Sequence, residues 1–189
     1  MTVVIREAVR GTDEAAVWAV LRPSVEAGDT FCADPTGGMA GGLAYFWPEN
    51  ARVWLAEETD PAETGSAQDN APLGSVEVLG CFYLRPNQTG NGGHVCNAGY
   101  CTLPAARGKG VAREMLVFSL ALAKAEGYRA MQYNFVVATN LRAINTWQRA
   151  GFDVVGRLPG AFAHPQKGYV DALVMYRDLW RTHDAWYGI

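Results

Sequence analysis

The clearest hydrophobic pattern in this chain lies between residues 111 and 126. Val111, Met115 and Phe118 recur at intervals of three and four residues, and charged residues occupy positions between them. This spacing places the apolar side chains on one face of an α-helix. Gly127 follows directly, and a glycine commonly ends a helix in the left-handed conformation. The pattern therefore predicts a long amphipathic helix that packs one face against a core.

Several shorter segments alternate apolar and polar residues, which is typical of strands with one buried face. Strands are predicted at residues 3–8, 52–57, 74–84, 94–103, 131–137, 152–158 and 171–177. Further helices are predicted after Thr12 until Pro23 disturbs the helix, near Leu43, and at 140–150, with loops at 59–72 and 159–170. A run of strands followed by alternating strands and helices indicates an α/β (α+β) fold in one domain, residues 1–189.

Composition and charge narrow the classes of function. The net charge is −3, and there is no basic stripe of the kind that nucleic-acid binding requires. No apolar run reaches the ~20 residues of a membrane span, and the N-terminus lacks a secretory signal, so we expect a cytoplasmic protein without a membrane partner. Cys32, Cys81, Cys96 and Cys101 form no Cys-x-x-Cys pair and have no His cluster nearby, which predicts free thiols and no metal.

Candidate chemistry appears where the predicted strand 94–103 meets the long helix. The connection contains Arg107-Gly108-Lys109-Gly110-Val111-Ala112. Its glycines allow a tight turn and close approach of a ligand, and the helix that follows presents unpaired N–H groups and the positive end of its dipole. These features predict a phosphate site. The residues lack both the nucleoside-triphosphate loop pattern and the dinucleotide Gly-x-Gly-x-x-Gly pattern.

A second block supports a family resemblance. In Asn140-Leu141-Arg142-Ala143-Ile144-Asn145-Thr146-Trp147-Gln148-Arg149-Ala150-Gly151-Phe152, Asn140 can cap a helix and Gly151 can end it. Together the two blocks resemble the GNAT superfamily of N-acetyltransferases over about residues 74–178. The resemblance implies acetyl-coenzyme A as cosubstrate and a mixed, mostly antiparallel sheet of about six or seven strands with about four helices. The residues that it assigns to the coenzyme are Tyr100, Thr102, Leu103, Arg107, Gly108, Lys109, Gly110, Val111, Ala112 and Asn140.

The usual acid and base of the superfamily are missing from their expected positions. Trp147 stands where many members have a Tyr that protonates the coenzyme sulfur, and an indole N–H is not a useful acid. Asn97 stands near the position where many members have a Glu base. Glu77, on the preceding strand, is the nearest candidate for a base acting through water, and a surface-facing strand residue is the alternative.

The asparagines point to one subgroup. The segments His94–Tyr100 and Tyr133–Asn140 resemble the fungal proline-analogue N-acetyltransferases, which detoxify azetidine-2-carboxylate. The resemblance places Asn97, Asn134 and Asn140 at the acceptor and coenzyme sites. Side-chain amides can bind a carboxylate without carrying a charge of their own, so Asn97 and Asn134 are candidates for recognising the acceptor. Ordinary capping and strand-edge roles are the alternative.

The leading hypothesis is therefore an enzyme that transfers acetyl from acetyl-coenzyme A to a small amine, for which the resemblance suggests a proline-like amino acid. Other acceptors remain open at this stage: a polyamine, an antibiotic or a protein N-terminus. A non-catalytic acyl-coenzyme A-binding module is the alternative of another class, because the Tyr and the Glu are absent. The resemblance also implies a homodimer, as in many members.

Overall fold

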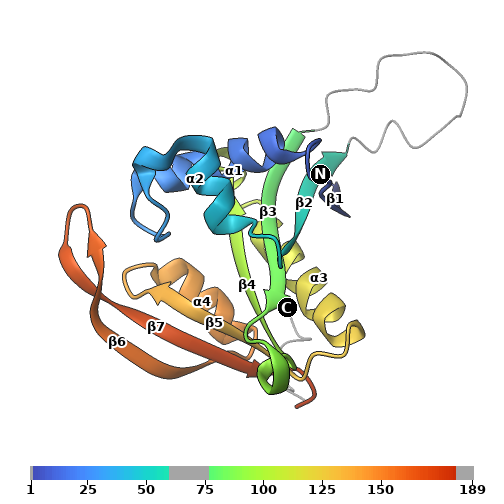
Figure 1. Ribbon diagram of the computed structural model, residues 1–189, viewed down its shortest axis with the longest axis vertical. Coiled ribbons are helices and arrows are strands. Elements are labelled where there is room, and N and C mark those ends of the chain that lie inside the picture. The colour runs from blue at the N-terminus through green and yellow to red at the C-terminus, as the bar shows by residue number, and fades with distance from the viewer. Residues whose placement is uncertain (1, 60–76, 182–189) are drawn as a thin grey trace, which may run out of the picture.

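One seven-stranded sheet organises the chain, of which the computed structural model describes residues 2–59 and 77–181 (Figure 1). The strand order is β1-β2-β3-β4-β5-β7-β6, and every neighbouring pair is antiparallel except β4 and β5. The strands are β1 (Thr2–Glu7), β2 (Arg52–Thr59), β3 (Glu77–Pro86), β4 (Val95–Thr102), β5 (Ala130–Val137), β6 (Asp153–His164) and β7 (Gly168–Asp178). The predicted loop after Thr59 and the start of the predicted strand 74–84 lie outside the described residues.

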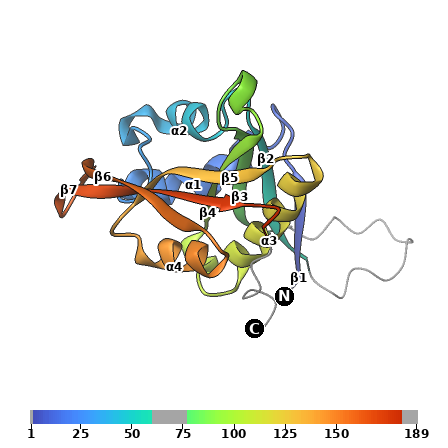
Figure 2. The same cartoon turned by 90° about the horizontal axis from the view of Figure 1, so that it is seen from below.

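Helices cover both faces of this sheet (Figure 2). The helices α1 (Glu14–Ala27) and α2 (Gly38–Phe46) bury Val17, Leu21 and Phe46 against one face. The helices α3 (Val111–Ala125) and α4 (Leu141–Arg149) bury Met115 and Trp147 against the other. The two apolar cores lie on opposite faces because successive side chains of each strand point to opposite sides. The predicted mixed, mostly antiparallel α/β fold is confirmed.

Two predicted boundaries were wrong. Pro23 lies inside α1, and the helix continues to Ala27 because buried side chains such as Val25 hold its last turns on the core. The predicted loop 159–170 is instead a hairpin of β6 and β7. A register shift between Leu158 and Phe162 accommodates Pro159 and the left-handed Gly160 on an edge strand, where the missing N–H of a proline costs little.

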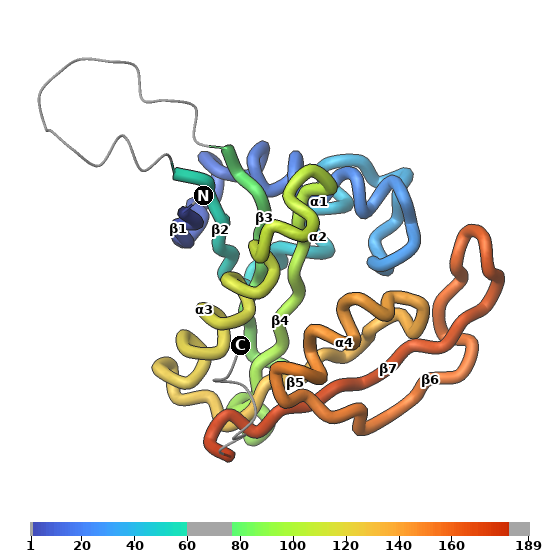
Figure 3. Tube along the Cα trace, turned by 180° about the vertical axis from the view of Figure 1, so that it is seen from behind, coloured from blue at the N-terminus to red at the C-terminus, as the bar shows by residue number. Residues whose placement is uncertain are grey.

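The strands β4 and β5 separate soon after they pair. Their parallel register begins with Val95 opposite Ala130 and ends with Asn97 opposite Gln132. Beyond that point β4 continues beside β3, whereas β5 turns away beside β7, and Figure 3 shows the two strands diverging. The divergence leaves one edge of β4 without a neighbouring strand. It opens toward the connection between β4 and α3.

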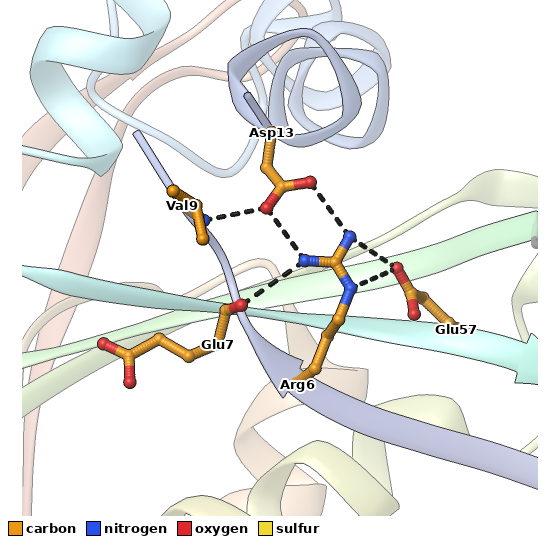
Figure 4. Close-up of polar contacts among 5 residues, drawn as sticks. All are labelled: Arg6, Glu7, Val9, Asp13 and Glu57. Carbon is orange, nitrogen blue, oxygen red and sulfur yellow. Dashed lines mark hydrogen bonds and ion pairs between the residues drawn. The ribbon is translucent and has the colours of Figure 1, made fainter. Parts of the chain in front are cut away.

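At the far end of the sheet, ion pairs join β1, β2 and α1. The Arg6 guanidinium donates from both Nη atoms to Asp13 at 2.8 and 2.9 Å and from Nε to Glu57 at 2.8 Å (Figure 4). The same Asp13 carboxylate accepts the Val9 N–H at 2.8 Å. Arg6 therefore holds the pKa of Asp13 below its usual value. Every donor atom of this guanidinium has a carboxylate or carbonyl partner.

None of the helices in residues 2–59 and 77–181 is long and apolar enough to cross a membrane.

Candidate functional site

The glycine turn has the conformation that its sequence predicts. Gly108 and Gly110 have φ values of +83° and +85°, in the left-handed region, and α3 begins directly after Gly110. A Cβ built on either glycine would meet nothing within 4 Å. Both glycines are therefore required by backbone conformation. The open space beside them leaves the turn accessible to a ligand.

The structure narrows which N–H groups of the turn can receive an anion. The N–H groups of Arg107 and Lys109 donate to the carbonyls of Pro104 and Ala106 at 3.2 and 3.3 Å. As the first residues of α3, Val111 and Ala112 have no partner within the helix. Of the six residues of the predicted turn, Gly108, Gly110, Val111 and Ala112 are the ones whose N–H groups form no backbone hydrogen bond within the turn and are suited to phosphate.

The free edge of β4 leads from the divergence of the strands to this turn. The Leu103 N–H donates to the Leu79 carbonyl at 2.9 Å, which fixes the alternation of the antiparallel β3–β4 ladder. Residues 97, 99, 101 and 103 then bond to β3, whereas the backbone groups of Tyr100 and Thr102 point away from it. No β5 residue pairs with β4 beyond Asn97. The backbone of Tyr100 and Thr102 is therefore available to a ligand that lies along this edge.

The register of β3 and β4 is continuous from residue 96 to residue 102. No bulge in β4 separates the strands over this stretch. The separation arises instead because β5 follows β7, with a register shift in β5 between Tyr133 and Val136. The free edge thus results from the path of β5 and not from a distortion of β4.

Aromatic side chains fill the α4 side of the divergence. The Trp147 ring lies 5.0 Å from that of Tyr100 and 5.1 Å from that of Tyr133, and Trp147 is only 9% exposed. The Tyr100 hydroxyl is paired with Ser119 at 2.7 Å. Burial raises the pKa of both tyrosines, so each remains a neutral phenol. Trp147 is packed as a core residue.

Asn97 lies at the point where the strands part. It is 3% exposed, and its Nδ2 donates to the Gln132 carbonyl at 2.8 Å across the last β4–β5 pair. Its Oδ1 accepts the Tyr83 hydroxyl at 2.8 Å and, in a longer contact, Arg85 Nε at 3.4 Å. The amide of Asn97 therefore joins β3, β4 and β5. This geometry suits a positioning residue.

Asn134 belongs to the same network but does not contact Asn97. Its Oδ1 accepts from Gln132 Nε2 at 2.7 Å, and its Nδ2 donates to Asn87 Oδ1 at 2.7 Å. Gln132 thus connects the two asparagines, through its backbone carbonyl on one side and its side chain on the other. A surface depression lies beside Asn87, lined by Asn50 and residues 86–90 and 93.

Glu77 lies elsewhere. It is an exposed residue at the start of β3, opposite Glu58 of β2. Arg85, whose backbone pairs with Asn97, is eight residues further along the same strand, which at about 3.4 Å per residue is on the order of 27 Å. The structure does not bring Glu77 together with Asn97 and Asn134. The hydrogen bonds of the two candidate histidines within the described residues are local. His94 Nδ1 pairs with the Asn91 carbonyl, and His164 Nδ1 accepts the Gln166 N–H.

Sequence reasoning did not single out Tyr83 and Arg85. Both lie on the face of β3 that is covered by α2, where Tyr83 packs on Phe46 with ring centroids 5.0 Å apart. The Arg85 guanidinium lies over the Tyr83 ring, 5.3 Å from its centroid. Burial raises the pKa of Tyr83 to about 12, so its hydroxyl remains a donor to Asn97. Their two-residue spacing was visible in the sequence, but their register against Asn97 was not.

The remaining predicted residues have simple positions. Asn140 caps α4, and its Oδ1 accepts the Ala143 N–H at 3.2 Å as expected. Cys96 and Cys101 are buried strand thiols, and Cys32 and Cys81 are also free. Among residues 2–59 and 77–181, no group of three or more His, Cys, Asp or Glu side chains could hold a metal ion.

Comparisons with known proteins agree with this geometry. A model of the acetyltransferase (GNAT) family matches residues 34–152. N-acetyltransferase aca1 of Schizosaccharomyces pombe is 34% identical over 128 residues, which are 66% of this chain and 61% of that relative. The chain thus spans less than two thirds of the length of that relative.

Solved structures extend the similarity to nearly the whole chain. A GCN5-related N-acetyltransferase from Kribbella flavida is 34% identical, with a TM-score of 0.78 and coverage of 93% of this chain and 97% of that one. A phosphinothricin acetyltransferase from Sinorhizobium meliloti, solved in complex with acetyl-coenzyme A, shares the fold at 20% identity, with a TM-score of 0.70 and coverage of 94% and 89%. The chain belongs to the acetyltransferase (GNAT) family.

Proposed function

We propose that this protein transfers the acetyl group of acetyl-coenzyme A to the amine of a small, carboxylate-bearing molecule. The observation that carries the proposal is the free edge of β4, which leads from the parting of β4 and β5 to a glycine turn at the start of a helix. A long, narrow cosubstrate with a thioester at one end and phosphates at the other matches this path. Membership of the family supports the same reaction class.

In this arrangement the pyrophosphate lies at the glycine turn. The N–H groups of Gly108, Gly110, Val111 and Ala112 donate to its oxygens, and Lys109 adds a positive charge nearby. The pantetheine arm then extends along the backbone of Tyr100 and Thr102 toward Asn97. A backbone N–H on this edge that donates to the thioester oxygen would stabilise the negative charge that develops during attack.

The reaction conserves atoms without a further reactant. The neutral amine attacks the thioester carbonyl, the carbon–sulfur bond breaks, and an amide and a coenzyme thiolate form. The amine loses one proton and the thiolate takes up one. For an amine of pKa ~10, forming the neutral base at pH ~7 costs about 4 kcal/mol. Asn97, Gln132 and Asn134 do not ionise in this range, so the proton leaves to water.

The acceptor is proposed to carry a carboxylate next to its amine. The side chains around the parting of the strands are neutral amides, a neutral phenol and one guanidinium. An acceptor rich in positive charge, such as a polyamine, would require acidic side chains here. A proline-like amino acid or azetidine-2-carboxylate, the acceptor class suggested by the sequence resemblance, has the matching charge.

Thiol release from acetyl-coenzyme A in the presence of an amine panel tests the proposed activity. We expect azetidine-2-carboxylate and proline analogues to release thiol faster than azetidine or pyrrolidine. Tight coenzyme binding with no turnover on any amine would replace the enzyme by a binding module. Preferred turnover of a polyamine would replace the acceptor class while retaining the transferase.

A matched pair of glycines tests the coenzyme site. Gly110 and Gly127 lie at the two ends of α3, share a φ of +85°, and have open space where a Cβ would lie. Gly110→Ala and Gly127→Ala should therefore introduce similar backbone strain. Only Gly110→Ala should weaken coenzyme binding, by at least tenfold in calorimetry, because its Cβ occupies the path of the phosphate. Equal affinities of the two variants would remove the turn from the coenzyme site.

A further inference from the structure

The surroundings of Arg85 differ in charge from those of three other arginines of the described chain. Arg6, Arg52 and Arg157 each form ion pairs with carboxylates. The ion pairs found within residues 2–59 and 77–181 do not include Arg85. Its contacts are the Tyr83 ring and the amide oxygen of Asn97, both neutral. The guanidinium thus retains most of its donors for a further partner.

The position of Arg85 is set by a rigid support. Tyr83 lies against β4 at Gly99, where a Cβ would be 2.5 Å from the Tyr83 ring, so only glycine permits this packing. Phe46 of α2 holds the other side of the Tyr83 ring. Arg85 stacks on that ring, and Asn97 contacts both side chains. A guanidinium held in this way loses little further freedom when it binds an anion.

The guanidinium also lies beside the place where the reaction would occur. In the sheet, Arg85 is opposite Asn97, and Asn97 is opposite Gln132 at the last β4–β5 pair. A guanidinium binds a carboxylate through two parallel N–H···O bonds, an arrangement that an amide cannot match in strength. Both ends of the Asn97 amide are already bonded within the protein. Arg85 is therefore better suited than Asn97 to hold an acceptor anion.

We propose that Arg85 binds the carboxylate of the acceptor, with Tyr83 and Asn97 as its positioning residues. This inference rests on the proposed function and names the side chain that recognises its substrate class. Arg85 orients the amine toward the thioester by fixing the carboxylate beside the parting of β4 and β5. Its positive charge also disfavours a second positive charge nearby, so it selects against polycationic acceptors.

Calorimetry separates this role from turnover. Azetidine-2-carboxylate and azetidine are titrated into the protein saturated with coenzyme A, which cannot acetylate them. We expect Arg85→Gln to weaken binding of the acid by about 10- to 100-fold, as the loss of charge-assisted bonds implies, and to leave azetidine binding unchanged. Arg85→Lys should fall between the two, because it keeps the charge but not the bidentate geometry.

Arg10→Gln is the matched control. Arg10 also stacks on an aromatic ring, that of Trp47 at 4.7 Å, and also bonds to neutral oxygens, but it follows β1, which β2 separates from β3 in the sheet. Arg10→Gln should leave the ratio of the affinity for azetidine-2-carboxylate to the affinity for azetidine at the wild-type value. The ratio should fall in Arg85→Gln with the affinity for coenzyme A unchanged.

The outcomes remain distinguishable. An unchanged ratio in Arg85→Gln, or no binding of the acid by the wild-type protein, overturns the role of Arg85. If thiol is released with amines but without preference for the acid, the carboxylate subsite is wrong and the transferase stands. If Arg85 is required for acid binding but no amine releases thiol, the subsite stands and the proposed reaction is wrong.

Discussion

Arg6 and Arg85 show how differently an edge and the middle of the sheet use the same side chain. Arg6 joins β1, β2 and α1 through two carboxylates, and its donors are all occupied. Arg85 stands where β4 and β5 part, and its contacts among the described residues are with an aromatic ring and an amide oxygen. The first arrangement fixes the fold by satisfying its own charges. The second leaves a charge for a ligand. Variants near Arg6 should therefore affect stability, and variants of Arg85 should affect binding of the acceptor.

The largest expected effect concerns the aromatic side chains that fill the α4 side of the parting of β4 and β5. Trp147→Ala should lower the free energy of unfolding by about 3–5 kcal/mol, because it leaves a cavity beneath Tyr100 and Tyr133. Trp147→Phe fills most of that space and should retain most of the turnover. Chemical denaturation and thiol release measure the two quantities. Loss of turnover in the Phe variant at unchanged melting temperature would show that the indole takes part in the chemistry.

The pH dependence of kcat/KM should show that protonation of the substrate amine limits the reaction proposed at the parting of β4 and β5. Between pH 7 and 9, kcat/KM should rise about tenfold per pH unit, because the neutral amine of a substrate of pKa ~10 increases in this range. Asn97 and Gln132 do not titrate, and the pKa of Tyr83, about 12, keeps its hydroxyl protonated throughout. A plateau that begins near pH 7 would reveal a base in the protein that this site does not contain.

Loss of the Arg6 ion pairs should instead change the stability of the fold, and the size of this change should depend on acid pH. Arg6→Gln should lower the free energy of unfolding by about 2 kcal/mol, because the Asp13 side chain is only 10% exposed and loses its charged partner. This loss is smaller than that expected for a fully buried pair, because the Arg6 side chain is 42% exposed and solvent screens its charge. The exposed helical pair of Arg22 and Glu26 provides the control, and Arg22→Gln should cost about 0.5 kcal/mol or less.

The sign of the pH effect follows from Asp13, whose pKa is lowered in the folded state by Arg6. The contribution of the pair is fully present above the unfolded pKa of ~3.9 and is lost as the pH falls through the lower folded pKa. The wild-type protein and Arg6→Gln should therefore converge in stability below pH ~4. Turnover of Arg6→Gln at neutral pH should equal that of the wild type. A changed acceptor preference would contradict a purely structural role for Arg6.

The smallest expected effect is that of Asn134→Ala. Its side chain is exposed and bonds to Gln132 and Asn87, so its removal should loosen the network without removing a charged contact. We expect the KM for the acid to rise about fivefold, equivalent to about 1 kcal/mol, with coenzyme affinity unchanged. Steady-state kinetics measures both. A rise as large as that of Arg85→Gln would mean that Asn134 contacts the acceptor directly.

Local chemistry allowed the sequence to predict the glycine turn and much of the helices beside it. Gly108 and Gly110 require a left-handed backbone, Asn140 can satisfy the first turn of a helix, and the apolar spacing from Val111 onward selects a helix. These properties depend on neighbours within a few residues. The hairpin at 159–170 was missed because Pro159 and Gly160 are read locally as a loop, whereas a bulge on an edge strand accommodates both.

The arrangement of side chains around the parting of β4 and β5 was decided by tertiary structure. The sequence identified Asn97, Asn134 and Glu77 as candidates, but their mutual positions depend on strand register and on the divergence of β5, which no local pattern encodes. The register placed Arg85 opposite Asn97 and left Glu77 at the other end of β3. Short-range backbone preferences thus determined most of the helices and strands and the glycine turn from the sequence alone. Pairing between distant strands decided which side chains meet, because a strand shows the alternation of its faces but not its partner.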